Sequence, residues 1–191
     1  MTFRSILGVG VAVGLLTVAC GGTTTEQSES TPATAAPAGT ATVLGDLLKD
    51  WERQKETMMT IADAMPEDKF GYKSTPPQRS YGEQVMHIAT VNVDVLKWIG
   101  GQTPAPSFTA ESAKTKADTL KAMADSYDYG TALLKEQTDT TITQTIDGRF
   151  LGPSTRARMF WFLLGHSMDI YGQMAVYLRL NGIVPPASRP R

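Results

Sequence analysis

The residues of this chain best suited to chemistry are its two histidines, His87 and His166. Both lie within apolar stretches, and a buried neutral imidazole must find partners for both ring nitrogens. Imidazole is also a common ligand of divalent metals, and helical bundles build metal sites from side chains on facing helices. Their positions therefore allow two interpretations, satisfied core histidines or metal ligands, and spacing alone favours the first.

Residue counts exclude several other kinds of site. Two histidines cannot supply three histidine ligands, and the single cysteine, Cys20, excludes an internal disulfide and a cysteine-based zinc site. No Gly-x-Ser-x-Gly sequence is present, and Ser167 beside His166 would diverge from it on a helix. With 18 basic and 19 acidic residues, the net charge of -1 gives no global attraction to nucleic acid.

The N-terminal region has the pattern of an export signal. Arg4 precedes an apolar run over residues 6–18 that is too short for a membrane-spanning helix. Residues 17–20 read Thr-Val-Ala-Cys, similar to a bacterial lipobox, so we expect a signal peptide over residues 1–19 and a lipid on Cys20. Ordinary secretion with cleavage near Ala19 is the alternative. Either route predicts an extracytoplasmic protein, and the first predicts a membrane-anchored lipoprotein at the periplasmic or cell surface.

A low-complexity linker follows over residues 20–40, rich in Gly, Thr, Ser, Ala and Pro, which we expect to be a disordered tether. The folded domain is expected over residues 41–188. Arg149, Arg156 and Arg158 form a modest basic cluster there, which we interpret as solvated surface charge, with an anionic ligand as the alternative.

Four amphipathic segments must position the histidines. Apolar residues at three- and four-residue spacing predict a first helix over 43–65, and Ser80 with Glu83 forms a capping-box pattern for a second helix that stops at Gly100. We expect the third to be capped by Thr109 and the fourth to run from near Ser154 to Asn181, and we treat residues 138–147 as loop. The expected buried stripe of the third helix is Ala113, Ala117, Leu120, Ala124, Tyr127 and Leu134. The prediction is an all-α four-helix bundle.

Several short segments carry a family resemblance, namely residues 85–89, 166–173, 176–179 and 182–186. In this order they resemble the DinB/YfiT-like superfamily of four-helix bundles, over about residues 43–188. The resemblance implies a divalent metal, often zinc or nickel, bound by one histidine on the second helix and two at His-x-x-x-His spacing on the fourth. It also implies a possible homodimer. Some members are thiol-dependent S-transferases or metal-dependent hydrolases, and many have no known activity.

Carried over residue by residue, the resemblance places His87 at the first ligand position and His166 at the second, but Ile170 at the third. Isoleucine has no lone pair, so the three-histidine site cannot form. Asp169 is the possible substitute, because a carboxylate and a histidine three residues apart converge on metals in other bundles. Its other interpretation is a hydrogen-bond partner for an imidazole or a surface residue.

Two functions from different classes remain at this point. The favoured one is a membrane-tethered, extracytoplasmic domain with an incomplete metal site, non-catalytic or binding a small ligand or partner protein. The missing third metal ligand favours this function. The expected extracytoplasmic location favours it as well, because the cytosolic thiols used by the family's enzymes are scarce there. The alternative is a metal-dependent hydrolase or thiol S-transferase using His87, His166 and Asp169. Lipidated Cys20 provides the expected membrane contact, and no nucleic-acid partner is expected.

Overall fold

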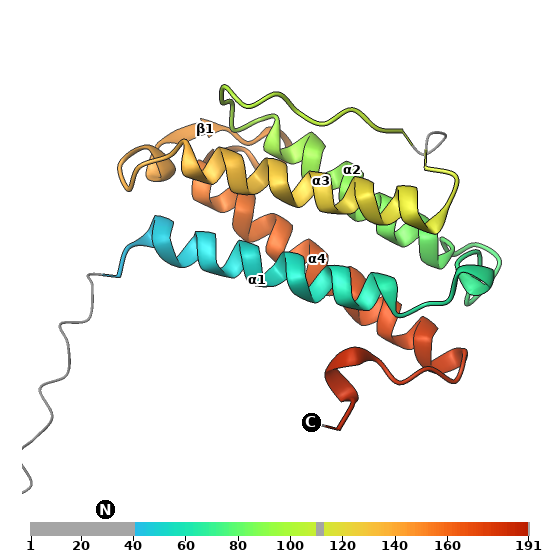
Figure 1. Cartoon of the computed structure of the whole chain (residues 1–191). Helices are drawn as coiled ribbons and strands as arrows, with labels where there is room; N and C mark the ends of the chain where they lie inside the picture. Colours follow the sequence, from blue (N-terminus) through green and yellow to red (C-terminus); the bar gives the residue numbers. More distant parts are fainter. Residues whose placement is uncertain (1–40, 110–112, 191) are drawn as a thin grey trace, which may run out of the picture. The chain divides into compact units, whose positions relative to one another are not determined.

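The computed structural model describes residues 41–109 and 113–190. Its main elements are four helices packed as a bundle, as Figure 1 shows, so the predicted all-α four-helix bundle is confirmed. The expected signal peptide, the lipidation site Cys20 and the linker lie outside the described residues. Within those residues, no helix combines the length and apolar character needed to cross a bilayer. The helices are α1 (Val43–Asp63), α2 (Tyr81–Leu96), α3 (Lys116–Lys135) and α4 (Arg156–Leu180).

The four helices form two pairs, and the two helices of each pair run in the same direction. In Figure 1, α1 and α4 run one way through the bundle while α2 and α3 run the other way. Because α2 and α3 are parallel, their connection must return along the bundle, and residues 97–109 of that connection do so. Both α1 and α2 pack against α3 and α4. The N-terminal ends of α2 and α3 consequently lie together at one end of the bundle.

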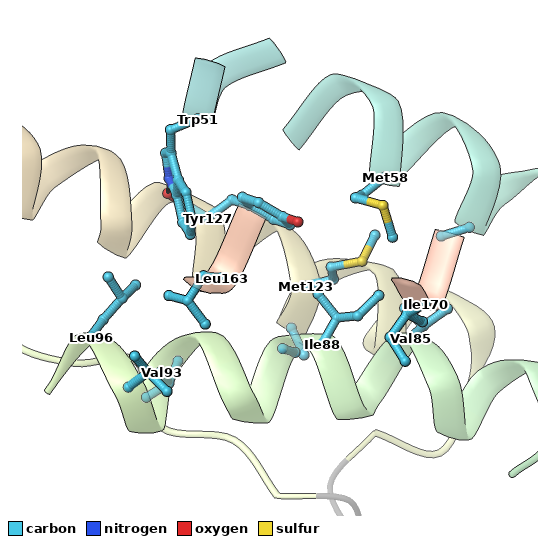
Figure 2. Packing of buried hydrophobic residues seen from close by; sticks show 14 of the residues in the cluster. Trp51, Met58, Val85, Ile88, Val93, Leu96, Met123, Tyr127, Leu163 and Ile170 are labelled. Carbon is cyan, nitrogen blue, oxygen red and sulfur yellow. Dashed lines mark hydrogen bonds between the residues drawn. The ribbon is translucent and has the colours of Figure 1, made fainter. Parts of the chain in front are cut away.

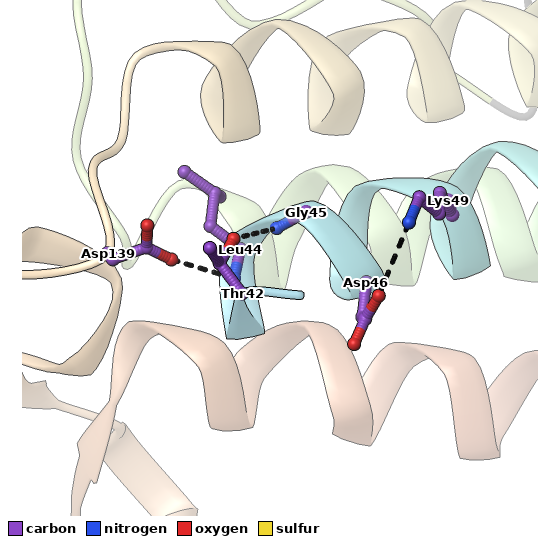
Figure 3. Close-up of polar contacts among 6 residues, drawn as sticks. All are labelled: Thr42, Leu44, Gly45, Asp46, Lys49 and Asp139. Carbon is purple, nitrogen blue, oxygen red and sulfur yellow. Dashed lines mark hydrogen bonds and ion pairs between the residues drawn. The ribbon is translucent and has the colours of Figure 1, made fainter. Parts of the chain in front are cut away.

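Side-chain caps fix where α1 and α2 begin. Thr42 accepts a hydrogen bond from the amide of Gly45 at 3.0 Å, and the Leu44 amide donates to Asp139 at 3.3 Å, as Figure 3 shows. Ser80 and Glu83 form the predicted capping box at the start of α2. Such a cap typically stabilises a helix by about 1 kcal/mol.

The start of α3 differs from the prediction. The cap is Thr115, in a capping box with Asp118, and Thr109 lies six residues too early. Both threonines follow polar or Pro-rich sequence, and only Thr115 has an acid three residues later. The buried face also differs, because Ala117 is exposed and polar Thr119 and Ser126 are buried. It comprises Thr119, Ala122, Met123, Ser126, Tyr127, Tyr129, Gly130, Leu133 and Leu134.

The segment before α4 is partly extended, which corrects the expectation of a loop throughout residues 138–147. Strand β1 (Thr145–Asp147) pairs antiparallel with β2 (Pro153–Thr155), with Thr145 opposite Thr155. Between them Arg149 has a φ of 55°, a left-handed conformation stabilised locally by its amide and guanidinium, which both donate to Asp147. Short 3-10 turns complete the described chain: η1 (Glu67–Lys69), η2 (Thr141–Thr143), η3 (Arg149–Leu151) and η4 (Pro186–Ser188).

The core joins all four helices, and Figure 2 shows part of it. Trp51 of α1 is fully buried, and its ring centroid lies 4.9 Å from that of Tyr127 on α3 and 5.2 Å from that of Phe160 on α4. The indole nitrogen donates to the Tyr127 carbonyl at 2.9 Å, so its polar edge is satisfied. Each such aromatic pair contributes about 0.5–1.5 kcal/mol beyond its buried area. This cluster therefore fixes α4 and its histidine against the other helices.

Candidate functional site

The structure brings the two histidines together. His87 on α2 and His166 on α4 meet edge to face, with ring centroids 5.0 Å apart and planes at 79°. Each side chain is half-buried. The two residues that the family resemblance gives as metal ligands therefore lie side by side, and two imidazoles at this separation can contact one small ligand.

No third ligand completes a metal site within residues 41–109 and 113–190, because no group of three His, Cys, Asp or Glu side chains gathers there. Ile170, one turn after His166, is 2% exposed and packs in the core beside Val85 (Figure 2). Asp169 is exposed and accepts a hydrogen bond from the amide of Gln173 at 3.2 Å. The described residues thus offer two imidazoles and a neighbouring apolar side chain, which do not fit the three-ligand metal site that the family resemblance implies.

The environment favours neutral imidazoles. Burial lowers the pKa of His87, and the nearby charges of Arg79 and His166 lower it further. Burial also lowers the pKa of His166, partly opposed by the Asp169 carboxylate, while Arg79 acts in the lowering direction. Each neutral ring has one nitrogen donor and one acceptor. The pair can therefore serve a ligand as donor and acceptor at neutral pH.

One ring nitrogen of the pair is available. His166 Nε2 is buried and makes no hydrogen bond to any described residue. Its ring is parallel to that of Phe162, with a 6.2 Å separation, which fixes the plane in which Nε2 lies. A buried polar atom without a partner costs about 1–3 kcal/mol, so a ligand atom or water that reaches Nε2 would be favoured.

A chain of hydrogen bonds joins polar side chains of α2 and α4, the two helices that carry the histidines. Gln84 donates to Gln173 at 2.8 Å, and Gln173 in turn donates to Asp169. Gln173 therefore joins the polar packing between the two helices. Glu83 caps α2 and pairs with Lys73 at 3.3 Å, so capping is its observed role. The amide of Gln173 thus holds one of the two oxygens of the Asp169 carboxylate.

A cleft of about 840 Å³ adjoins His87 at the shared N-terminal end of α2 and α3. Its wall carries several cations that the sequence analysis did not single out, Arg79 and Lys114 among them. Their only sequence signal is position, since each directly precedes an N-cap, Ser80 or Thr115.

The arginines near α4 have structural roles. Arg149 pairs with Asp147 at 3.0 Å, and Arg158 donates to Ser154 at 3.0 Å. Arg156 donates to the carbonyls of Ile99 and Thr141 and thus joins two loops to α4. Each guanidinium is occupied within the chain, and the alternative of an anion site made by this cluster is not supported.

Comparisons with known proteins agree with the four-helix fold. The family model described as the DinB superfamily matches residues 50–174. A DinB-like protein from Bacillus cereus ATCC 10987 is similar in structure, with 24% identity, a TM-score of 0.53, and 73% of this chain and 93% of that one covered. A DinB-like protein from Bacillus subtilis gives 18% identity, a TM-score of 0.58, and coverage of 76% and 99%. No curated protein matches the chain.

Proposed function

The chain belongs to the DinB superfamily, and from this premise we propose that it is a non-catalytic domain that binds a small ligand beside His87 and His166. The observation that carries the proposal is Ile170, buried one turn after His166 where the family resemblance places a third histidine. A metal held by two imidazoles alone lacks the third protein ligand that catalytic zinc sites use.

The state of the histidine pair supports ligand binding. His166 Nε2 lies buried without a partner among the described residues, and His87 lines the adjoining cleft. Both pKa values are lowered, so the rings remain neutral and can donate and accept hydrogen bonds near pH 7.

We further propose that the domain works outside the cytoplasm, held to a bacterial membrane by a lipid on Cys20. The support is the sequence pattern of residues 1–20, in which an apolar run ends in small residues before the cysteine. The polar linker over residues 20–40 would let the domain stand off the membrane surface.

The alternative is a divalent-metal-dependent hydrolase or thiol S-transferase that uses zinc or nickel. Its one favourable observation is Asp169, whose carboxylate acts electrostatically on His166 and raises that pKa against the effect of burial. Gln173 donates a hydrogen bond to Oδ2 of Asp169, and the second carboxylate oxygen, Oδ1, would be the one offered to a metal. Such a metal with an open position would polarise a substrate or activate water.

Metal content separates the two functions. The full chain, an Ile170→His variant and a His166→Ala variant are each offered zinc, nickel and manganese, freed of excess metal and subjected to elemental analysis. We expect metal only in Ile170→His, because that change supplies a third imidazole. Stoichiometric metal in the wild type that is lost in His166→Ala would contradict the proposal and support the hydrolase or transferase alternative.

A further inference from the structure

The cleft beside His87 is rich in positive charge. Among the described residues, its lining contains Lys73, Arg79, Lys114 and Lys116 and two carboxylates, Glu67 and Glu83. At about 840 Å³ it lies within the range of small-molecule sites, about 300–1,000 Å³. An excess of cations in a concave site raises the local concentration of anions.

Two of the four cations are already paired. Lys73 lies 3.3 Å from Glu83, and Lys116 lies 2.9 Å from Asp63 and also donates to the Asp63 carbonyl. The side chains of Arg79 and Lys114, in contrast, make no hydrogen bond or ion pair with any described residue. Arg79 and Lys114 are therefore the cations that a ligand can engage.

The fold places these two cations at the same end of the bundle. Arg79 directly precedes Ser80, the cap of α2, and Lys114 directly precedes Thr115, the cap of α3. Since α2 and α3 run parallel (Figure 1), both caps lie at one end of the bundle, and Ser80 and Thr115 line the same cleft. The capping boxes already satisfy first-turn amides, so an anion here would be held by the side chains of Arg79 and Lys114.

The remaining wall is partly apolar. Phe70 and Met86 are nearly buried and line the cleft, together with half-buried Ala113. His87 adds a ring that can stack on or hydrogen-bond to a ligand. A ligand matched to this wall carries an apolar portion as well as an anionic group.

We propose that this cleft binds a soluble small molecule that joins a phosphate or carboxylate group to an apolar portion. The anion is held by Arg79 and Lys114, and the apolar portion lies against Phe70 and Met86. This proposal rests on the proposed function, because it assumes that the domain binds its ligand without converting it. It adds the chemical class of that ligand.

Phenyl phosphate is a suitable probe, with benzyl alcohol as the neutral control. The full chain is labelled at its methionine methyl groups, and the Met86 signal, identified with Met86→Leu, is followed by NMR during titration in the presence of a chelator. We expect saturable shifts of the Met86 signal with phenyl phosphate and none with benzyl alcohol. Arg79→Gln and Lys114→Gln should each weaken binding roughly tenfold, the loss typical of a charged hydrogen bond.

Lys49→Gln is the matched control, because it removes the same charge from an exposed lysine on α1 outside the cleft. It should leave the affinity unchanged. Equal weakening by Lys49→Gln, equal binding of benzyl alcohol, or no binding of phenyl phosphate would overturn the assignment. Displacement of the probe by phosphatidylglycerol vesicles but not by phosphatidylcholine vesicles would overturn it in favour of a lipid headgroup.

Failure here is distinguishable from failure of the proposed function. Elemental analysis of the same preparation decides whether the chain holds metal, whatever the probe does. The titration is therefore repeated without the chelator. If phenyl phosphate binds in neither titration, the ligand class is wrong while the incomplete metal site stands. If phenyl phosphate binds only when the chelator is left out and the chain holds metal, both the ligand assignment and the non-catalytic proposal are overturned.

Discussion

Ile170 follows His166 by one helical turn on α4, yet the isoleucine is 2% exposed while the imidazole is half-buried. The two side chains lie on the same general face of α4, but Ile170 points further into the core, where it packs beside Val85 (Figure 2). Metal binding at position 170 therefore depends on how the side chain there packs in the core. Any residue placed at position 170 must satisfy the core before it can serve a metal.

We expect Ile170→His to destabilise the metal-free domain by about 2–4 kcal/mol, because it removes buried apolar contacts and leaves polar nitrogens in the core. Zinc should restore part of that loss, since it binds the folded state alone. Urea unfolding with zinc and with a chelator measures both effects. Ile170→Val should lower the unfolding free energy by about 1 kcal/mol, and zinc should not change the stability of that variant. Identical curves for Ile170→His with and without zinc would contradict the expectation.

Acidification should destabilise the domain through its histidine pair. The folded-state pKa values of both rings are lowered, whereas an unfolded histidine has a pKa of about 6.5. The unfolded state therefore binds more protons between these values, and the unfolding free energy falls as pH drops below about 6.5. The decline ends once pH passes below the lowered folded-state pKa values.

The measurement is the urea unfolding free energy between pH 7.5 and pH 5, where most carboxylates stay ionised. A His87→Gln/His166→Gln double variant is the control, because these are the only histidines in the chain. Its unfolding free energy should vary less with pH across this range. A wild-type stability that rises on acidification to pH 5.5 would show that the histidine pKa values are not lowered.

The sequence predicts most of the fold because three helices have strong local signals. The α2 capping box at Ser80 and Glu83, and the end of α4 at Asn181 before Gly182, lie where expected. The third helix was also predicted, but part of its buried face was wrong because that face includes polar residues that tertiary contacts satisfy. Ser126, for example, accepts a hydrogen bond from Asn92 of α2 at 3.2 Å, which an apolar-stripe analysis cannot detect.

Of the candidate site, only the histidine pair could be expected before the structure was known. The family resemblance, and not the sequence around the two histidines, implies that they share a site, and the structure places their ring centroids 5.0 Å apart. The cleft was not predictable, because Arg79 and Lys114 are 35 positions apart and ordinary in type. They share a cleft only because the long α2–α3 connection makes the two helices parallel. Topology, which local patterns do not encode, creates that part of the site.

Two helical glycines should respond oppositely to alanine. A Cβ at Gly130 of α3 would lie 2.4 Å from Cζ2 of Trp51, which is fully buried, whereas a Cβ at Gly165 of α4 meets nothing within 4 Å. We expect Gly130→Ala to cost about 1–3 kcal/mol through overpacking and Gly165→Ala to stabilise by about 0.5–1 kcal/mol. Urea unfolding of both variants tests this pair. Stabilisation by Gly130→Ala would mean that Trp51 can move at little cost.

Replacement of Cys20 should release the protein from the membrane. In a bacterial host, we expect the wild-type chain to sediment with membranes and to carry acyl chains by mass spectrometry, because two acyl chains give stable anchoring. Cys20→Ser has no thiol to lipidate and should lack these chains. Ser28→Ala, in the same linker, is the matched control and should behave as the wild type. A wild-type chain recovered without acyl chains, cleaved near Ala19, would instead establish ordinary secretion.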